Sequence, residues 1–150
     1  MKKALLAFFT FSFSLFTLLS EAQYTKLHDF KDTTGGYPYG SLTLIGNTLY
    51  GIATAGGAHD SGCIFSITTS GTSYRDLFDF KHLQGAFPYG SLTLSGNKFY
   101  GMSREGGAHD SGCVFSIDTN GLAYADLHDF TSKTGWGPYG SLILRGDLLY

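Results

Sequence analysis

The sequence is poor in the residues that mark several protein classes. It contains two cysteines and three prolines in 150 residues, and only 15% of its residues are charged, with a net charge of −2. Two cysteines cannot form the disulfide framework of a small secreted domain. A charge so close to neutral gives no electrostatic basis for binding nucleic acid. The sequence also has no run of about eighteen or more apolar residues, which argues against a membrane-spanning helix.

Helical patterning is missing as well. Beyond residue 22, no stretch of useful length shows the 3.6-residue apolar period of an amphipathic helix. Glycine, by contrast, is abundant at 21 residues, and aromatic residues make up 16% of the chain. This composition favours a β-rich protein with many tight turns.

The first 22 residues have the composition of a signal peptide. Met1-Lys2-Lys3 is positively charged, residues 4–19 are rich in Leu and Phe, and Ser20-Glu21-Ala22 places small residues where a signal peptidase requires them. An uncleaved anchor helix is the alternative, but the apolar stretch is shorter than the about twenty residues that a span needs. We therefore predict a signal-peptide helix over 1–22, cleavage before Gln23, a secreted or cell-surface location and no membrane span after cleavage.

The rest of the sequence is a tandem repeat with a period of 50 residues. Residues 39–80 and 89–130 align without a gap and are identical at 28 of 42 positions, and Tyr-Gly-Ser-Leu recurs a third time at 139–142. A period near 50 is the length of a kelch-type propeller blade. Within 23–150 we define a first unit at about 24–80, a second at 81–130 and a partial third at 131–150.

Each full unit is predicted to contain four short strands. In the first unit, two alternating segments flank Gly46-Asn47, a pair typical of tight hairpin turns. A glycine-rich loop over 56–62 separates the second strand from the third. The expected strands are 41–45, 48–53, 63–68 and 73–80. The fold class is therefore all-β, with tandem four-stranded antiparallel blades.

Several spaced motifs recur in a constant order. They are Pro88-Tyr89-Gly90-Ser91-Leu92, Gly96-Asn97-Lys98-Phe99-Tyr100-Gly101, Gly106-Gly107, Gly112-Cys113-Val114-Phe115-Ser116-Ile117 and Leu127-His128-Asp129-Phe130. This pattern is similar to a kelch blade and resembles more closely the GloVer tandem repeats of exported bacterial proteins. The resemblance implies β-propeller-like blades and an exported protein, but it supplies no catalytic residues. Closed propellers have about four to eight blades, so we expect an incomplete ring.

His59-Asp60-Ser61 and His109-Asp110-Ser111 contain the residue types of a hydrolase triad. Three consecutive residues cannot pass a proton from Ser to His to Asp, and the tripeptide is duplicated in both units. We therefore expect these loops to be structural, with a ligand contact as the alternative. No loop has the pattern of an EF-hand.

Aromatic residues precede each Tyr-Gly-Ser-Leu motif. Tyr37 and Phe87 stand at equivalent positions, and Trp136 stands one position earlier in the third unit. In a four-stranded blade, the loop between strands two and three and the link to the next blade open on the same face. The candidate binding residues on that rim are His59, Asp60, His109, Asp110, Tyr37, Phe87 and Trp136. Exposed rings beside polar groups suit sugar stacking, whereas plugging gaps between blades is the structural alternative.

Two further sets of recurring residues are interpreted as structural. His28 and His128 correspond to Phe78, which favours an aromatic packing role over catalysis, and the aspartate that follows each of them is expected to accept backbone hydrogen bonds between blades. Cys63 and Cys113 share a strand face with apolar residues, so we predict buried free thiols rather than a disulfide.

The sequence therefore predicts an exported binding or surface scaffold module. Its expected partners are a carbohydrate or a cell-surface protein, together with further copies of itself that would close open blade edges. The alternatives are a propeller hydrolase or lyase acting on polysaccharide, and a truncated fragment without independent function. We expect no catalytic residue, metal or cofactor.

Overall fold

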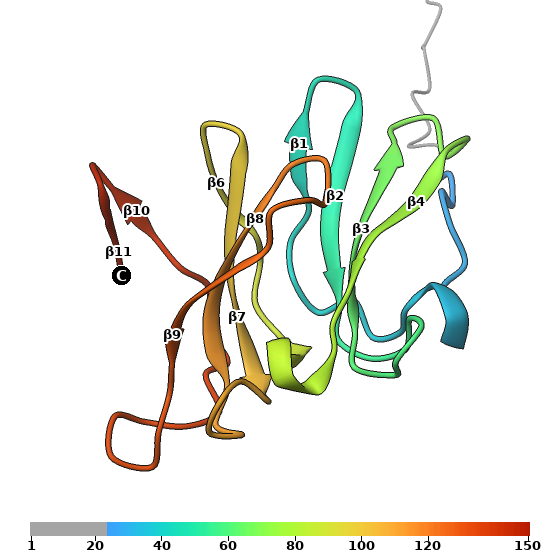
Figure 1. The fold of residues 1–150 in the computed structure, drawn as a ribbon. Coiled ribbons are helices and arrows are strands. Elements are labelled where there is room, and N and C mark those ends of the chain that lie inside the picture. The colour runs from blue at the N-terminus through green and yellow to red at the C-terminus, as the bar shows by residue number, and fades with distance from the viewer. Residues whose placement is uncertain (1–23) are drawn as a thin grey trace, which may run out of the picture.

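The computed structural model describes residues 24–150, so the predicted leader over 1–22 lies outside the described part of the chain. The described residues form antiparallel sheets that follow one another along the chain (Figure 1). The prediction of an all-β protein is therefore confirmed. Within residues 24–150, no helix is long and apolar enough to cross a membrane.

The first unit is a four-stranded antiparallel sheet in the order β1-β2-β3-β4. Its strands are β1 (Thr43–Ile45), β2 (Thr48–Ala53), β3 (Cys63–Thr68) and β4 (Tyr74–Asp79). Ile45 pairs with Thr48 across the predicted two-residue turn, in which Gly46 adopts a positive φ of 58°. A positive φ at the first turn residue matches the right-handed twist of a hairpin.

The second unit repeats this sheet and adds one short strand. Its strands are β5 (Ala86–Pro88), β6 (Thr93–Ser95), β7 (Lys98–Glu105), β8 (Cys113–Asp118) and β9 (Ala125–Asp129). The third unit contributes one hairpin, β10 (Leu144–Arg145) paired with β11 (Leu148–Leu149). Figure 1 shows the sheets of the three units in chain order, with the first described residues and the C-terminus at opposite sides.

The core lies between successive units. Ile52 and Ile64 of the first unit pack with Phe99, Phe115 and Ile117 of the second in one buried cluster. A second cluster lies on the other face of the first sheet, where β3 supplies Cys63, Phe65 and Ile67 beside Ala53 of β2. Both faces of the first sheet are therefore apolar, and one of them packs against the second unit.

The predicted strand positions agree with the structure to within two residues at each boundary. The first strand begins at Thr43 rather than Ser41, because the backbone N–H of Ser41 donates to the hydroxyl of Ser91 in the next unit and not to a strand. The expectation of no helix after the leader is wrong for two three-residue 3-10 turns, η1 (Asp32–Thr34) and η2 (His82–Gln84). A single turn of this kind is too short to produce an apolar period.

Candidate functional site

Each glycine-rich loop between the second and third strands is held by a carboxylate of the fourth strand. Asp79 accepts a 2.6 Å hydrogen bond from the backbone N–H of Ala58, and Asp129 accepts one of 2.7 Å from Ala108. A Cβ on Gly57 would lie 2.3 Å from Asp79 Oδ1, so only glycine permits this approach. Asp79 and Asp129 accept backbone hydrogen bonds as predicted, but the expectation that these bonds join neighbouring blades is wrong, because donor and acceptor belong to the same unit.

The third recurring aspartate has a different partner. Asp29 forms a 2.8 Å ion pair with Lys26, in place of a loop contact. Lys26 occupies the position of Asp76 in the first unit and Asp126 in the second.

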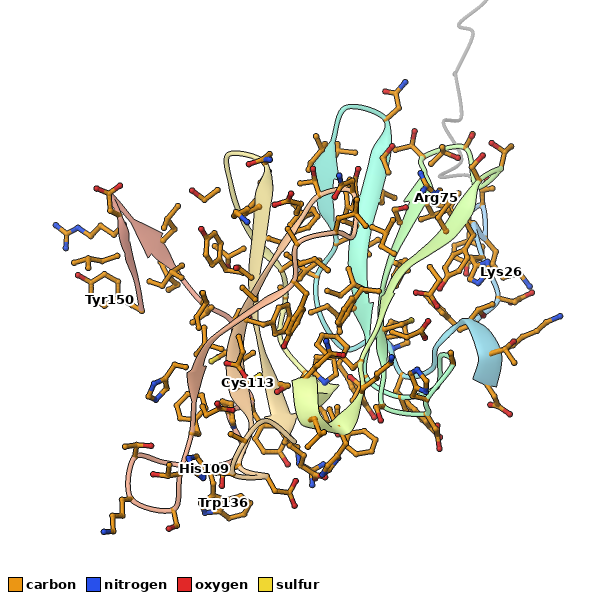
Figure 2. All side chains as sticks on the ribbon, viewed as in Figure 1. Lys26, Arg75, His109, Cys113, Trp136 and Tyr150 are labelled. Atoms are coloured by element: carbon orange, nitrogen blue, oxygen red, sulfur yellow. The ribbon has the colours of Figure 1, made fainter. Side chains whose placement is uncertain are left out.

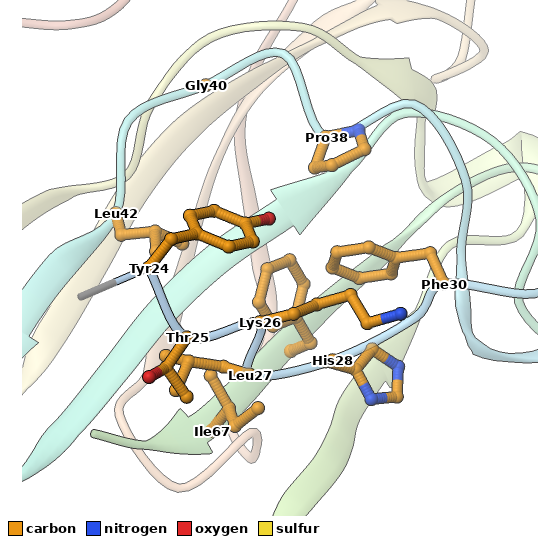
Figure 3. Close-up of a pocket in the computed structure, with 11 residues that line it drawn as sticks. Tyr24, Thr25, Lys26, Leu27, His28, Phe30, Pro38, Gly40, Leu42 and Ile67 are labelled. Atoms are coloured by element: carbon orange, nitrogen blue, oxygen red, sulfur yellow. The ribbon is translucent and has the colours of Figure 1, made fainter. Parts of the chain in front are cut away.

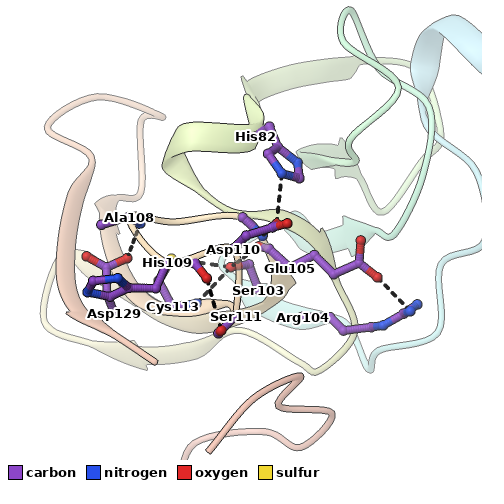
Figure 4. A network of polar contacts seen from close by, with 11 residues as sticks. His82, Ser103, Arg104, Glu105, Ala108, His109, Asp110, Ser111, Cys113 and Asp129 are labelled. Atoms are coloured by element: carbon purple, nitrogen blue, oxygen red, sulfur yellow. Dashed lines mark hydrogen bonds and ion pairs between the residues drawn. The ribbon is translucent and has the colours of Figure 1, made fainter. Parts of the chain in front are cut away.

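The His-Asp-Ser tripeptides stabilise their own loops. Asp60 has a positive φ of 51° and accepts a hydrogen bond from Gly56 N, while the Ser61 hydroxyl donates to the carbonyl of His59. The second loop repeats both contacts through Asp110 and Ser111 (Figure 4). Each serine hydroxyl is therefore directed to a backbone carbonyl oxygen of its own loop and not to a histidine ring.

One contact is specific to the second loop. His82 Nε2 of η2 lies 2.8 Å from Asp110 Oδ1 (Figure 4). The residue equivalent to His82 in the first unit is Asp32, which cannot pair with Asp60 in this way. The two loops therefore have the same internal hydrogen bonds, but the adjoining 3-10 turn carries Asp32 in the first unit and His82 in the second.

The links between units lie against these loops. The backbone N–H of Phe87 donates to the carbonyl of Ser61, and that of Gly137 donates to the carbonyl of Ser111. Tyr37 accepts a hydrogen bond at its carbonyl from Thr54, just after β2. The structure thus places the loops and the links at the same end of the sheets, and Figure 2 shows His109 and Trp136 at this end.

The backbone at the linking aromatics is strained. Tyr37 and Phe87 adopt left-handed φ values of 54° and 50°, which cost a residue with a side chain about 1–2 kcal/mol. In the third unit Gly137 takes that conformation instead, and the neighbouring Trp136 is 76% exposed. An aromatic ring therefore stands at this end of all three units. In the first two units the residue that carries it, Tyr37 or Phe87, adopts a left-handed backbone that is unfavourable for any residue with a side chain.

Tyr37 and Phe87 line a common recess of about 190 Å³. The remaining residues around it are Tyr39, Thr54, Ala55, Tyr89 and Arg104. His59, Asp60, His109, Asp110 and Trp136 do not line this recess. The structure thus brings two of the seven candidate residues together in one hollow, while four others lie on the glycine-rich loops and Trp136 lies on the link before Gly137.

A ladder of three tyrosine rings, from Tyr39, Tyr89 and Tyr139, runs past this recess from unit to unit. The sequence did not predict that these rings would form a common surface. The rings of Tyr39 and Tyr89 stack with centroids 5.1 Å apart, and those of Tyr89 and Tyr139 lie 4.9 Å apart. The Arg104 guanidinium lies 6.0 Å from the Tyr89 centroid and 5.6 Å from that of Tyr139. The recurrence of Tyr-Gly-Ser-Leu was the available signal, but it indicated a strand start and not a stack.

Both cysteines are buried and free. Burial raises the pKa of the Cys63 thiol to about 12, so it is a poor nucleophile. The Tyr74 hydroxyl donates to the Thr34 carbonyl, and Tyr124 does the same to Gln84. The predicted free thiols are confirmed.

The His28 ring stacks on Tyr74 with centroids 4.0 Å apart, as the Phe78 ring stacks on Tyr124 at 4.6 Å, which confirms the aromatic role predicted for His28. Within residues 24–150, no three His, Cys, Asp or Glu side chains are grouped to hold a metal ion.

The carboxyl of Asp76 makes stability depend on pH. The residue as a whole is solvent-exposed, but partial desolvation of its carboxyl, followed by the nearby Asp79 charge, raises its pKa from 3.8 to about 6. The folded state then binds more protons than the unfolded state between these values, so the free energy of unfolding falls as pH rises through that window. We expect Asp76→Asn to be more stable than the wild type at pH 7 and to lose this slope, as measured by urea unfolding from pH 3.5 to 7.5.

Asp126→Asn is the matched control for that experiment. The pKa of Asp126 is raised by the same causes, but its carboxyl is less buried, so the change in slope is expected to be smaller. Equal slopes in the wild type and Asp76→Asn would contradict the prediction.

A family model described as the Gloeobacter/Verrucomicrobia repeat matches residues 14–150. The match includes the three units and every candidate residue named above. No curated protein and no solved structure matches the chain.

Proposed function

The chain belongs to the Gloeobacter/Verrucomicrobia repeat family, as its spaced motifs predicted, and from this membership we propose an exported carbohydrate-binding module built of propeller-like blades. A four-stranded and a five-stranded antiparallel sheet that follow one another along the chain and pack through apolar faces support the blade interpretation. The composition of residues 1–22 supports export and a secreted or cell-surface location.

The observation that carries the binding proposal is the placement of Tyr37 and Phe87. Both rings line one recess although their backbones adopt a conformation that glycine would adopt at lower cost. Tyr37 is 67% exposed, so its ring gains little from burial. Phe87 is half-buried. Backbone strain kept at two equivalent positions, neither of them in the buried core, is typical of a functional site rather than of core packing.

The chemistry of the recess suits a sugar ring. Exposed tyrosine and phenylalanine faces accept the apolar C–H face of a pyranose, and the ring hydroxyls need polar partners nearby. The Arg104 guanidinium supplies hydrogen-bond donors at the edge of the recess, where Glu105 holds it in a 2.6 Å ion pair. The Thr54 hydroxyl already donates its hydrogen bond to the Pro88 carbonyl, so Thr54 forms part of the wall of the recess but does not donate to a sugar.

A glycan array followed by calorimetry with the retained sugars tests this proposal. The informative variant is Tyr37→Gly combined with Phe87→Gly, because glycine removes both rings and relieves the backbone strain together. We expect at least a tenfold loss of affinity with no loss of folding stability. Tyr150→Ala removes a ring that is 65% exposed on another part of the surface, and it is expected to bind as the wild type does.

Two results would overturn the proposal. One is a wild-type protein that retains no glycan, and the other is a double glycine variant that binds with wild-type affinity.

A further inference from the structure

Consecutive units are joined by one contact that the structure contains twice. The backbone N–H of Ser41 donates to the Ser91 hydroxyl at 2.8 Å, and that of Ser91 donates to Ser141 at 2.8 Å. The Thr43 hydroxyl donates to the Leu92 carbonyl, and Thr93 does the same to Leu142. In each contact the earlier unit supplies the donors and the later unit supplies the acceptors.

Glycine lets the backbones meet at the centre of this contact. A Cβ on Gly40 would lie 2.5 Å from the Gly90 carbonyl oxygen, and a Cβ on Gly90 would lie 2.1 Å from that of Gly140. On Gly140 itself, by contrast, an added Cβ meets only Met102 Cε, at 3.9 Å. Among the described residues, the third unit therefore presents the donor side of the contact without an acceptor side against it.

The first unit presents the acceptor side. Leu42 is 48% exposed, whereas the equivalent Leu92, covered by the first unit, is 5% exposed. Beside Leu42 lies a largely apolar pocket of about 340 Å³ that reaches Phe65 and Ile67 of β3 (Figure 3). The same face of the second unit is filled by the first unit.

The segment over 24–30 shows what this face accommodates. Leu27-His28-Asp29-Phe30 corresponds to residues 77–80 at the end of β4. Phe30 lies edge-on to Phe65 at 4.9 Å, as Phe80 lies edge-on to Phe115 at 5.1 Å. The segment therefore covers the first unit as a fourth strand does. The hairpin β10–β11, at the other end, corresponds to the first two strands of a blade.

We propose that a second copy of the chain docks head to tail, with the third unit of one copy against the first unit of the other. The contact continues the two internal ones: Ser141 N donates to Ser41 Oγ of the second copy, Gly140 meets Gly40, and Tyr139 extends the tyrosine ladder to Tyr39. Because the two surfaces differ, the arrangement is heterologous and allows more than two copies to join. It also places a further row of aromatic rings at each junction.

One residue makes this junction weaker than the internal contacts. Ile143 stands where Thr43 and Thr93 carry the hydroxyl that donates to the following leucine carbonyl. The junction between copies therefore lacks one hydrogen bond, and we expect association that depends on protein concentration.

Sedimentation velocity of the purified protein over a range of concentrations tests the proposal. We expect the wild type to exceed the mass of a single chain as concentration rises, where the full 150 residues weigh 16.2 kDa and the cleaved form weighs less. Gly140→Ala is expected to remain monomeric with unchanged stability, since its Cβ has space within one copy. Ile143→Thr restores the missing donor and is expected to tighten association about threefold to tenfold, the usual value of one hydrogen bond.

Gly36→Ala is the matched control, because it adds the same methyl group at a glycine whose nearest contact is 3.9 Å away and which lies outside the Tyr-Gly-Ser contact. It should associate as the wild type does. A wild type that stays monomeric at 0.1 mM, roughly a hundred times a dissociation constant of about 1 μM, overturns the proposal. Association of Gly140→Ala with wild-type affinity does so too.

Discussion

Replacing Phe80 with alanine is expected to lower the free energy of unfolding by about 3–5 kcal/mol, the usual cost of emptying a buried phenylalanine site. Phe80 is fully buried and follows directly after β4 of the first unit. Its ring lies edge-on to Phe115 of the second unit at 5.1 Å and to Phe78 at 5.2 Å. The side chain therefore joins two sheets, and its loss removes a contact between units as well as apolar burial.

Urea unfolding followed by tryptophan and tyrosine fluorescence measures this loss. Phe30→Ala is the matched control, because Phe30 makes the equivalent contact with Phe65 on the first unit but is only half-buried. We expect it to cost about 1–2 kcal/mol, in proportion to the smaller area removed from water. Equal losses in the two variants would show that Phe80 does not join the units as described.

Gly106→Ala is expected to cost about 2–5 kcal/mol, the sum of a left-handed backbone strain and an overpacked contact. Gly106 has a φ of 74°, and a Cβ there would lie 2.0 Å from the carbonyl oxygen of His82. That carbonyl already accepts a hydrogen bond from Gly107 N, which fastens the loop over 106–112 to η2. The added methyl group therefore has to separate the loop from η2.

Gly96→Ala separates the two contributions. Gly96 has a similar φ of 59°, but a Cβ there meets nothing within 4 Å. It should therefore show the backbone strain alone, about 1–2 kcal/mol. Thermal unfolding of both variants measures the difference, and a Gly106→Ala midpoint equal to that of Gly96→Ala would be evidence against the steric contact.

The strands and turns were predictable because their causes are local. Alternating apolar residues on either side of Gly46-Asn47 predict a hairpin, and β1 and β2 pair across that turn. The structural role of the His-Asp-Ser loops was also predictable, since a duplicated tripeptide flanked by glycines is typical of a turn. The Ala58 N–H donates to Asp79 across 21 residues, so the sequence indicated the acceptor but placed its donor in a neighbouring blade.

The recess and the tyrosine ladder were not predictable in this way. The position of Phe87 in sequence does not reveal its left-handed backbone, which is set by the hydrogen bond from its N–H to Ser61 of the preceding unit. In the sequence, Arg104 is only a replacement for the equivalent Thr54 of the first unit, whereas in the structure its guanidinium lies over the rings of both Tyr89 and Tyr139.

By itself the sequence determined the 50-residue period, the four-stranded units, the turns between strands and the family, because each depends on residue types at short spacing. Only the tertiary structure decided how closely successive units approach. The contacts at Gly40, Gly90 and Gly140 join residues 50 positions apart, and their spacing sets the tyrosine stack, the recess and the exposure of Leu42. Such distances follow from the packing of whole sheets, and no local pattern encodes them.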